Sequence, residues 1–195
     1  MSNFIHIPKN GGTSVKSKCN DVIIYNGHDS DPKTLKNRVV IIRNPFDRFA
    51  SAVAYSIKEG IKNEDENILT LVYEDFVDPS KWAEIIFGNE KDHPMYDNIM
   101  QEVLNKSHII GKYKPKFKWT YTEQSRWFYN PTKVILFDNM NEEFKNSFEI
   151  ELPYENESNK GRVVYSKEAK TLLLRHYKKD FKLYFKMKSS LATIY

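Results

Sequence analysis

The sequence predicts an α/β fold in which a central, mostly parallel β-sheet is flanked by helices. Two short apolar runs rich in β-branched residues, Phe4–Ile7 and Val39–Ile42, are typical of strands buried on both faces of a parallel sheet. Each run is followed directly by turn residues and then by a helical pattern. With 195 residues, 40% hydrophobic and 29% charged, the chain is long enough to bury a sizeable core. We therefore expect residues 1–195 to form a single domain.

The first apolar run leads into the segment PKNGGTS. A proline ends the strand, two glycines permit a tight turn, and the threonine and serine can open a helix. The amides of such a turn and the positive end of a helix dipole bind phosphate, and the lysine adds a mobile cation. In an ATP- or GTP-binding loop the lysine follows the glycines, so this segment is a different phosphate loop, or else an ordinary turn. The candidate residues are Pro8, Lys9, Asn10, Gly11, Gly12, Thr13 and Ser14.

The second apolar run ends in RNPFDRFAS. Asn44 can cap a helix that begins at Pro45, and an apolar stripe at helical spacing follows. Arg43 therefore stands at the carboxyl end of a strand, where open α/β sheets bind ligands. Ser51 lies about two turns into the helix.

These two segments resemble the nucleotide-binding motifs of the sulfotransferases that use 3′-phosphoadenosine 5′-phosphosulfate (PAPS). PKNGGTS is similar to their 5′-phosphosulfate loop, and RNPFDRFAS is similar to their 3′-phosphate motif, R-x-P-x-x-R-x-x-S. The resemblance implies that Lys9 and its loop hold the 5′-phosphosulfate and that Arg43 and Ser51 hold the 3′-phosphate. It also implies a P-loop-like, three-layer sulfotransferase fold, 3′-phosphoadenosine 5′-phosphate (PAP) as the product, and no metal.

A histidine follows the next predicted strand, Asp21–Tyr25, and its Asn-Gly turn. The ordinary pKa of histidine, about 6.5, suits a general base near neutral pH. Many glycan sulfotransferases carry a Gly-His pair at this place, so the resemblance implies that His28 is the catalytic base, with Asp29 and Asp31 as substitutes. The alternative is a surface histidine of the turn. His6, inside the first strand, is interpreted as a buried, hydrogen-bonded core residue.

Residues from about 60 to 118 are expected to form a helical variable region between sheet strands. Gly60 is expected to end the long helix that begins at Pro45, and three helical patterns follow, separated by proline- and glycine-containing breaks. The segment 112–119, KYKPKFKW, alternates cations with aromatic residues or proline. Such interleaving suits nucleic-acid or polyanion binding, but it also suits an exposed edge strand protected by lysines, which we favour.

Three features of the C-terminal part complete the candidate set. YTEQSRWF resembles the F-x-P-Q-S-x-Y/W segment of glycan sulfotransferases, with Glu123 in place of the proline, which implies that Gln124 and Ser125 line the active site. A fourth strand is expected at 134–137. Lys160 and Arg162 resemble the basic-glycine loop that covers the nucleotide in the cytosolic branch. Residues 166–187 are expected to be helical and amphipathic, with aromatic residues that serve packing.

Charge and cysteine content narrow the function classes. The net charge is +4, and residues 160–188 carry ten Lys or Arg against two acids, which indicates an anionic partner or, as we favour, a solvated helix face. Cys19 is the single cysteine, so neither a disulfide within the chain nor a cysteine metal cluster is expected. The sequence lacks a run of 18 apolar residues, and we expect a cytoplasmic protein without a membrane partner.

The sequence thus predicts a sulfotransferase that moves a sulfuryl group from PAPS to an acceptor hydroxyl, with a saccharide as the expected acceptor. One alternative is a noncatalytic binder of polyanions or nucleic acid, based on the basic C-terminal third and on KYKPKFKW; nucleic acid is the weaker expectation. The other is a small nucleotide kinase, which would share the strand–loop–helix layout but needs magnesium and a lysine after the glycines. The sequence leaves the oligomeric state open.

Overall fold

A computed structural model of the chain describes residues 1–18, 22–104, 116–153 and 163–192. By their contacts the described residues group into two compact units. The sheet unit comes from Met1–Pro45, Glu123–Glu157 and Lys179–Tyr195, and the helical unit comes from Phe46–Thr122 and Ser158–Lys178. The expectation that residues 1–195 make a single domain stays a prediction.

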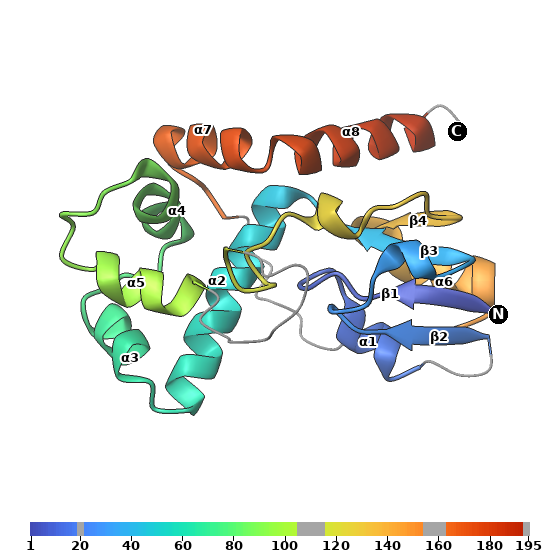
Figure 1. The fold of residues 1–195 in the computed structure, drawn as a ribbon, viewed down its shortest axis with the longest axis horizontal. Helices are drawn as coiled ribbons and strands as arrows, with labels where there is room; N and C mark the ends of the chain where they lie inside the picture. The colour runs from blue at the N-terminus through green and yellow to red at the C-terminus, as the bar shows by residue number, and fades with distance from the viewer. Residues whose placement is uncertain (19–21, 105–115, 154–162, 193–195) are drawn as a thin grey trace. The chain divides into compact units, whose positions relative to one another are not determined.

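The sheet unit contains a four-stranded, fully parallel sheet with the strand order β2-β1-β3-β4 (Figure 1). The strands are β1 (Ser2–Ile5), β2 (Ile23–Asn26), β3 (Arg38–Ile42) and β4 (Lys133–Leu136). All four strands fall within two residues of the predicted runs. The prediction of a parallel α/β sheet flanked by helices is confirmed.

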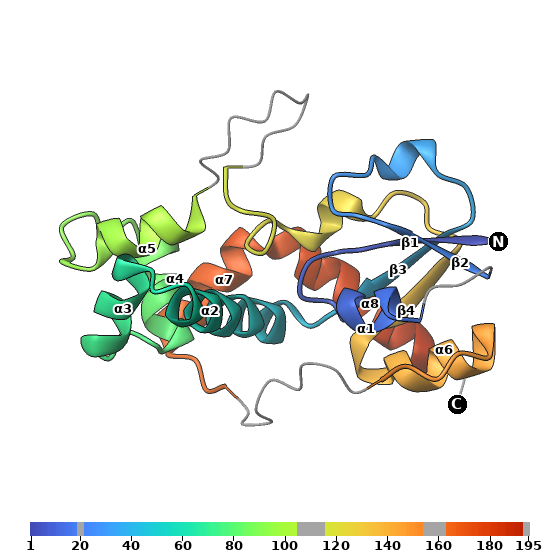
Figure 2. The same cartoon turned by 90° about the horizontal axis from the view of Figure 1, so that it is seen from below.

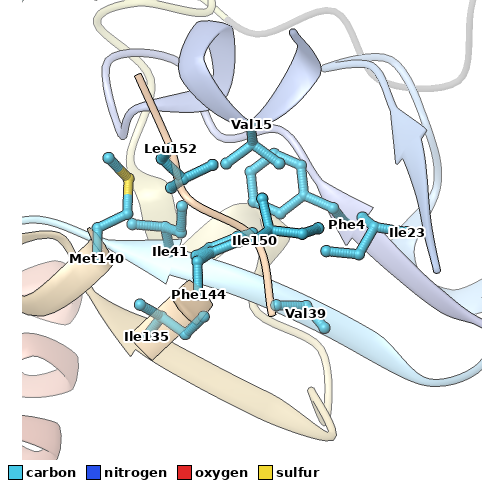
Figure 3. Close-up of a cluster of buried hydrophobic side chains, with 10 residues drawn as sticks. All are labelled: Phe4, Val15, Ile23, Val39, Ile41, Ile135, Met140, Phe144, Ile150 and Leu152. Atoms are coloured by element: carbon cyan, nitrogen blue, oxygen red, sulfur yellow. The ribbon is translucent and has the colours of Figure 1, made fainter. Parts of the chain in front are cut away.

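Side chains that alternate along each strand pack helices on both faces of the sheet. On one face, the strand residues form a core with α1 (Gly12–Lys16) and α6 (Met140–Phe148), and both helices are seen in Figure 2. That cluster consists of Phe4, Val15, Ile23, Val39, Ile41, Ile135, Met140, Phe144, Ile150 and Leu152 (Figure 3). On the other face, Ile42 and Leu136 pack with Tyr184 of α8 (Lys178–Ala192). The sheet unit therefore has three layers.

Helix α1 begins at Gly12, so the Thr13 and Ser14 that were expected to open it lie inside the helix. Gly11 is the N-cap residue, with φ 77°, and no side chain caps the helix. A Cβ atom at Gly11 would lie 2.5 Å from the sulfur of Met140. Glycine is therefore favoured here both by the left-handed backbone and by the close approach of α6.

The helical unit consists of α2 (Pro45–Lys62), α3 (Glu66–Tyr73), α4 (Pro79–Gly88), α5 (Tyr96–Val103) and α7 (Lys167–His176). Asp65 caps α3 by accepting hydrogen bonds from the amides of Asn67 and Ile68. Asp78 caps α4 in the same way, immediately before Pro79. Helix α4 packs against α7, and α3 packs against α5.

The prediction that Gly60 ends the long helix is wrong, because α2 continues to Lys62. Gly60 is buried, and a Cβ atom at this position would overlap the side chain of Ile68 on α3. The glycine therefore allows two helices to approach closely instead of terminating one. A glycine that allows close contact between two helices and a glycine that ends a helix cannot be distinguished from the local sequence.

The segment 166–187, expected to be helical, forms two helices, α7 and α8, with a break at Tyr177. The hydroxyl of Tyr177 donates a hydrogen bond of 2.7 Å to the backbone oxygen of Tyr121 within the helical unit. Tyr177, Phe181 and Tyr184 are buried, as expected for packing residues, whereas Phe185 is 54% exposed. No glycine or proline marks the break, which is why helical periodicity does not reveal it.

Candidate functional site

The strongest candidates for function follow the carboxyl ends of three adjacent strands. Strand β1 leads to Lys9, β2 leads to His28, and β3 leads to Arg43. Because the strands are parallel, these ends share one edge of the sheet. The strand order passes from β1 to β2 in one direction and from β1 to β3 in the other. The switch point therefore lies between β1 and β3, which is where open α/β sheets bind their ligands.

Lys9 and Arg43 adjoin at this switch point. The Nη1 of Arg43 donates a hydrogen bond of 3.2 Å to the backbone oxygen of Lys9. The guanidinium carbon lies 4.3 Å from the centroid of the Phe137 ring, which directly follows β4. The guanidinium is thus held against the loop that carries the lysine. The structure brings together the two cations that the sequence predicts as anchors.

The loop after β1 has an uncommon backbone conformation. Lys9 has φ 66° and Gly11 has φ 77°. For a lysine the left-handed region costs roughly 1–2 kcal/mol, a kind of strain that clusters at functional sites. Turns of this kind can point successive amides into one concave space that binds anions. Helix α1 has only five residues. Its dipole is therefore short, and an anion here would depend mainly on the loop amides and on lysine.

Asn10, at the middle of the loop, is buried, with 1% of its surface exposed. Its Nδ2 donates to the backbone oxygen of Ile41 at 2.7 Å and to the Oε1 of Gln124 at 2.9 Å. Its Oδ1 is buried, and the described residues provide it with no hydrogen-bond partner. Such an unpaired acceptor costs about 1–3 kcal/mol.

Of the two hydroxyls predicted to contact phosphate, that of Thr13 is on an exposed residue and that of Ser14 is on a buried one.

Gln124 holds the backbone after β3. It begins the 3₁₀ helix η2 (Gln124–Trp127) and is fully buried. Its Nε2 donates to the backbone oxygen of Arg43 at 2.8 Å, and its Oε1 accepts from the amide of Arg43 at 3.1 Å. The resemblance implied that Gln124 and Ser125 line the active site. In the structure Gln124 contacts both candidate loops through Arg43 and Asn10.

Asp180 is a site-supporting residue that the sequence interpretation missed. It belongs to the first turn of α8 and has no exposed surface. Its two carboxylate oxygens accept hydrogen bonds from the amides of Gln124, at 2.7 Å, and Ser125, at 2.8 Å. A signal was present, because an acid at position 180 falls on the same helix face as the buried Tyr177 and Tyr184. A charged residue on an apolar face indicates a specific polar partner.

His28 is half-buried and is held at several points. Its Nδ1 lies 3.0 Å from the backbone oxygen of His6, and its own backbone oxygen accepts a hydrogen bond of 2.8 Å from the Nε1 of Trp127. A carbonyl oxygen can only accept, so Nδ1 carries the proton in the neutral ring. The Nε2 of His28 is then the nitrogen with a lone pair, as a general base requires. Asp29 is exposed, and Asp31 caps the 3₁₀ helix η1 (Pro32–Thr34).

His6 packs against His28, with 4.1 Å between the ring centroids. Its Nδ1 is hydrogen-bonded to the hydroxyl of Tyr25. Burial is the main cause that lowers the pKa of His6 from 6.5 to about 3, and the charges of His28, Lys16 and Lys9 lower it further. His6 is therefore neutral at ordinary pH. A Cβ atom at Gly12 would overlap the imidazole of His6, which explains why glycine is needed there.

The remaining predicted residues belong to other parts of the chain. Ser51 lies on α2 in the helical unit, where it is half-buried. Lys160 and Arg162 lie outside the described residues. So does the first half of KYKPKFKW. Its second half, 116–119, contributes one isolated antiparallel bridge between Leu104 and Phe117, and the predicted edge strand is otherwise untested.

Within the described ranges, no group of three or more His, Cys, Asp or Glu side chains could hold a metal ion. None of the helices in the described part of the chain is long and apolar enough to span a bilayer. Comparison of the chain with protein-family models, curated protein sequences and solved structures finds no match. Any inference about function therefore depends on the site residues themselves.

Proposed function

We propose that this chain is a PAPS-dependent sulfotransferase that moves a sulfuryl group to an acceptor hydroxyl, with a saccharide as the expected acceptor. The observation that carries the proposal is the contact between Arg43 and Lys9 at 3.2 Å, at the switch point of the sheet. Two cations on neighbouring strand ends suit a ligand that carries two separate anionic groups. A P-loop-like sulfotransferase fold is part of this proposal.

The two ends of the nucleotide have different binding residues in this scheme. Lys9 and the amides of the loop Asn10–Ser14 bind the 5′-phosphosulfate. Arg43 binds the 3′-phosphate, because a guanidinium pairs well with phosphate oxygens and Phe137 already orients it. For Ser51, a contact with that phosphate stays a prediction from the sequence. PAP remains bound as the product after transfer.

Transfer is an in-line displacement at sulfur. The acceptor oxygen forms a bond to sulfur while the bond between sulfur and the bridging oxygen of the 5′-phosphate breaks. The proton of the acceptor hydroxyl moves to the Nε2 of His28, whose Nδ1 is engaged with the backbone oxygen of His6. The negative charge that develops on the leaving phosphate is stabilised by the ammonium of Lys9. A general base of this kind typically contributes 10²–10⁴-fold to the rate.

Thermal unfolding with added nucleotides tests the binding half of the proposal. PAP without metal should stabilise the protein, by about 2.7 kcal/mol at a concentration 100 times its Kd. Stabilisation by ATP with magnesium but not by PAP would favour a nucleotide kinase. Stabilisation by heparin or oligonucleotides alone would favour a noncatalytic polyanion binder. Either outcome would overturn the proposal.

Two substitutions test the assigned residues. Lys9→Ala should retain the fold but lower sulfuryl transfer by about 10²–10³-fold, as for removal of one preorganised group from a transition state. Lys36→Ala, at an exposed lysine of the sheet unit, is the matched control and should behave as the parent. Arg43→Ala should weaken PAP binding by about 2 kcal/mol or more, and 5′-AMP binding much less. Near-normal turnover of Lys9→Ala, measured by mass detection of sulfated saccharides, would contradict the scheme.

A further inference from the structure

The pairing of β1 with β3 stops short of the residues proposed to bind the nucleotide. The last paired residues are Ile5 and Val40, and β3 itself ends at Ile42. Lys9 and Arg43 both follow these ends. Their spacing is therefore not set by the backbone ladder of the sheet. Side-chain contacts provide the connection instead: the bond from Arg43 to the oxygen of Lys9 and, in addition, two side-chain amides.

The amide of Gln124 pairs with Arg43 as a strand residue would. It donates to the backbone oxygen of Arg43 at 2.8 Å and accepts from the amide of Arg43 at 3.1 Å. The same Oε1 accepts from the Nδ2 of Asn10 at 2.9 Å, and that nitrogen also donates to the backbone oxygen of Ile41. One side-chain amide thus contacts the loop after β1 and the backbone after β3. All of these groups are buried or half-buried, so water competes little for the bonds.

Asp180 fixes the backbone of Gln124 from α8. One carboxylate oxygen accepts from the amide of Gln124 at 2.7 Å and the other from the amide of Ser125 at 2.8 Å. Hydrogen bonds to an ionised carboxylate are short and about twice as strong as those between neutral groups. These two amides are the first two of the 3₁₀ helix η2. The glutamine is therefore held at its backbone as well as at its amide.

We propose that Gln124, oriented by Asp180, is a positioning residue that sets the spacing between the 5′-phosphosulfate loop and the 3′-phosphate anchor. This role rests on the proposed function. The 3′- and 5′-groups of one nucleotide are separated by a fixed ribose, so a rigid spacing of their two binding segments avoids an ordering cost on binding. Loss of the connection through Gln124 should therefore weaken the binding of ligands that occupy both segments more than the binding of ligands that occupy one.

The test compares Gln124→Met with Gln101→Met. Methionine keeps the length of the side chain but lacks the amide, and Gln101 is an exposed glutamine of α5 in the helical unit. Calorimetry gives Kd for PAP, 5′-AMP and 3′-AMP with each protein. In Gln124→Met the preference for PAP over either monophosphate should fall by at least about fivefold, the lower end of typical coupling between two sites. Gln101→Met should keep the preference of the parent.

A measurement without ligand distinguishes the positioning role of Gln124 from the proposed function of the chain. Hydrogen exchange of the Arg43 amide should be slow in the parent and much faster in Gln124→Met, since its acceptor is removed. Retained protection of that amide, or equal weakening of all three nucleotides, would overturn the positioning role while leaving the proposed function intact. Failure of the parent to bind PAP would instead refute the proposed function.

If Gln124→Met does not fold, Asp180→Asn is the second variant. It keeps the shape of the side chain but replaces one accepting oxygen by an NH₂ group that faces a backbone amide. The same loss of preference for PAP is expected. An unchanged preference in folded Asp180→Asn would overturn the orienting role of Asp180.

Discussion

His6 should make the stability of this protein fall as the pH is lowered from 6.5 toward 3. Its pKa is lowered to about 3 in the folded chain, mainly by burial, and returns to about 6.5 on unfolding. Between these values the unfolded chain binds a proton at His6 and the folded chain does not. The unfolded state is thereby favoured as the pH falls, so this contribution to stability is complete above pH 6.5 and is lost below it.

The loss of unfolding free energy through His6 depends on how far the pH lies below 6.5. Each pH unit in this window is worth about 1.4 kcal/mol, so lowering the pH from 8 to 5 should cost about 2 kcal/mol of unfolding free energy through His6. The groups that oppose a charge on His6 are the neighbouring cations His28, Lys16 and Lys9. The hydroxyl of Tyr25 is its hydrogen-bond partner.

Urea unfolding of the parent and of His6→Gln at constant ionic strength measures this contribution. The parent should lose about 2 kcal/mol more than His6→Gln between pH 8 and pH 5. Between pH 7.5 and pH 9 the two stability curves should run parallel, since His6 is neutral in both states there. Equal losses in the two proteins down to pH 5 would refute the lowered pKa and with it the burial argument.

Two further predictions concern helix packing and catalysis. Gly60→Ala should lower the unfolding free energy by about 1–2 kcal/mol, because the new Cβ overlaps Ile68. Gly88→Ala is the control and should be neutral or slightly stabilising, because its Cβ meets Leu172 at an ordinary 3.5 Å. Similar effects of the two changes in thermal unfolding would contradict the close approach of α2 and α3. His28→Gln should lower sulfuryl transfer by about 10²–10⁴-fold and remove the acid limb of the pH–rate profile, and an unchanged profile would show that another group is the base.

Local patterns were sufficient to locate the strands and the residues that follow them. Apolar β-branched runs are followed by the turn residues proline, glycine or asparagine, and this pattern locates Lys9, His28 and Arg43 just beyond the strand ends. One error also has a local cause, since Gly60 is interpreted from the sequence as a helix end, although it serves a contact with α3. The break between α7 and α8 at Tyr177 has no breaker residue and is therefore not predicted by local patterns.

The roles of Gln124 and Asp180 show what local patterns do not contain. Gln124 is 81 residues from Arg43 and 114 residues from Asn10, and Asp180 is 56 residues from Gln124. Hydrogen bonds between segments so far apart leave no periodicity in either segment. A resemblance to a short motif indicated that Gln124 belongs near the site. It did not indicate that the side chain pairs with backbone instead of ligand.

The sequence by itself determined which residues stand at the ends of strands, because strand, turn and helix preferences act over a few neighbouring residues. Only the tertiary structure decided the strand order β2-β1-β3-β4, which brings the ends of β1 and β3 together at the switch point. It also decided the contact of Arg43 with Lys9 and the amide connection through Gln124. These depend on which distant segments share one sheet edge, and that choice is made by burial of the whole core instead of by any single segment.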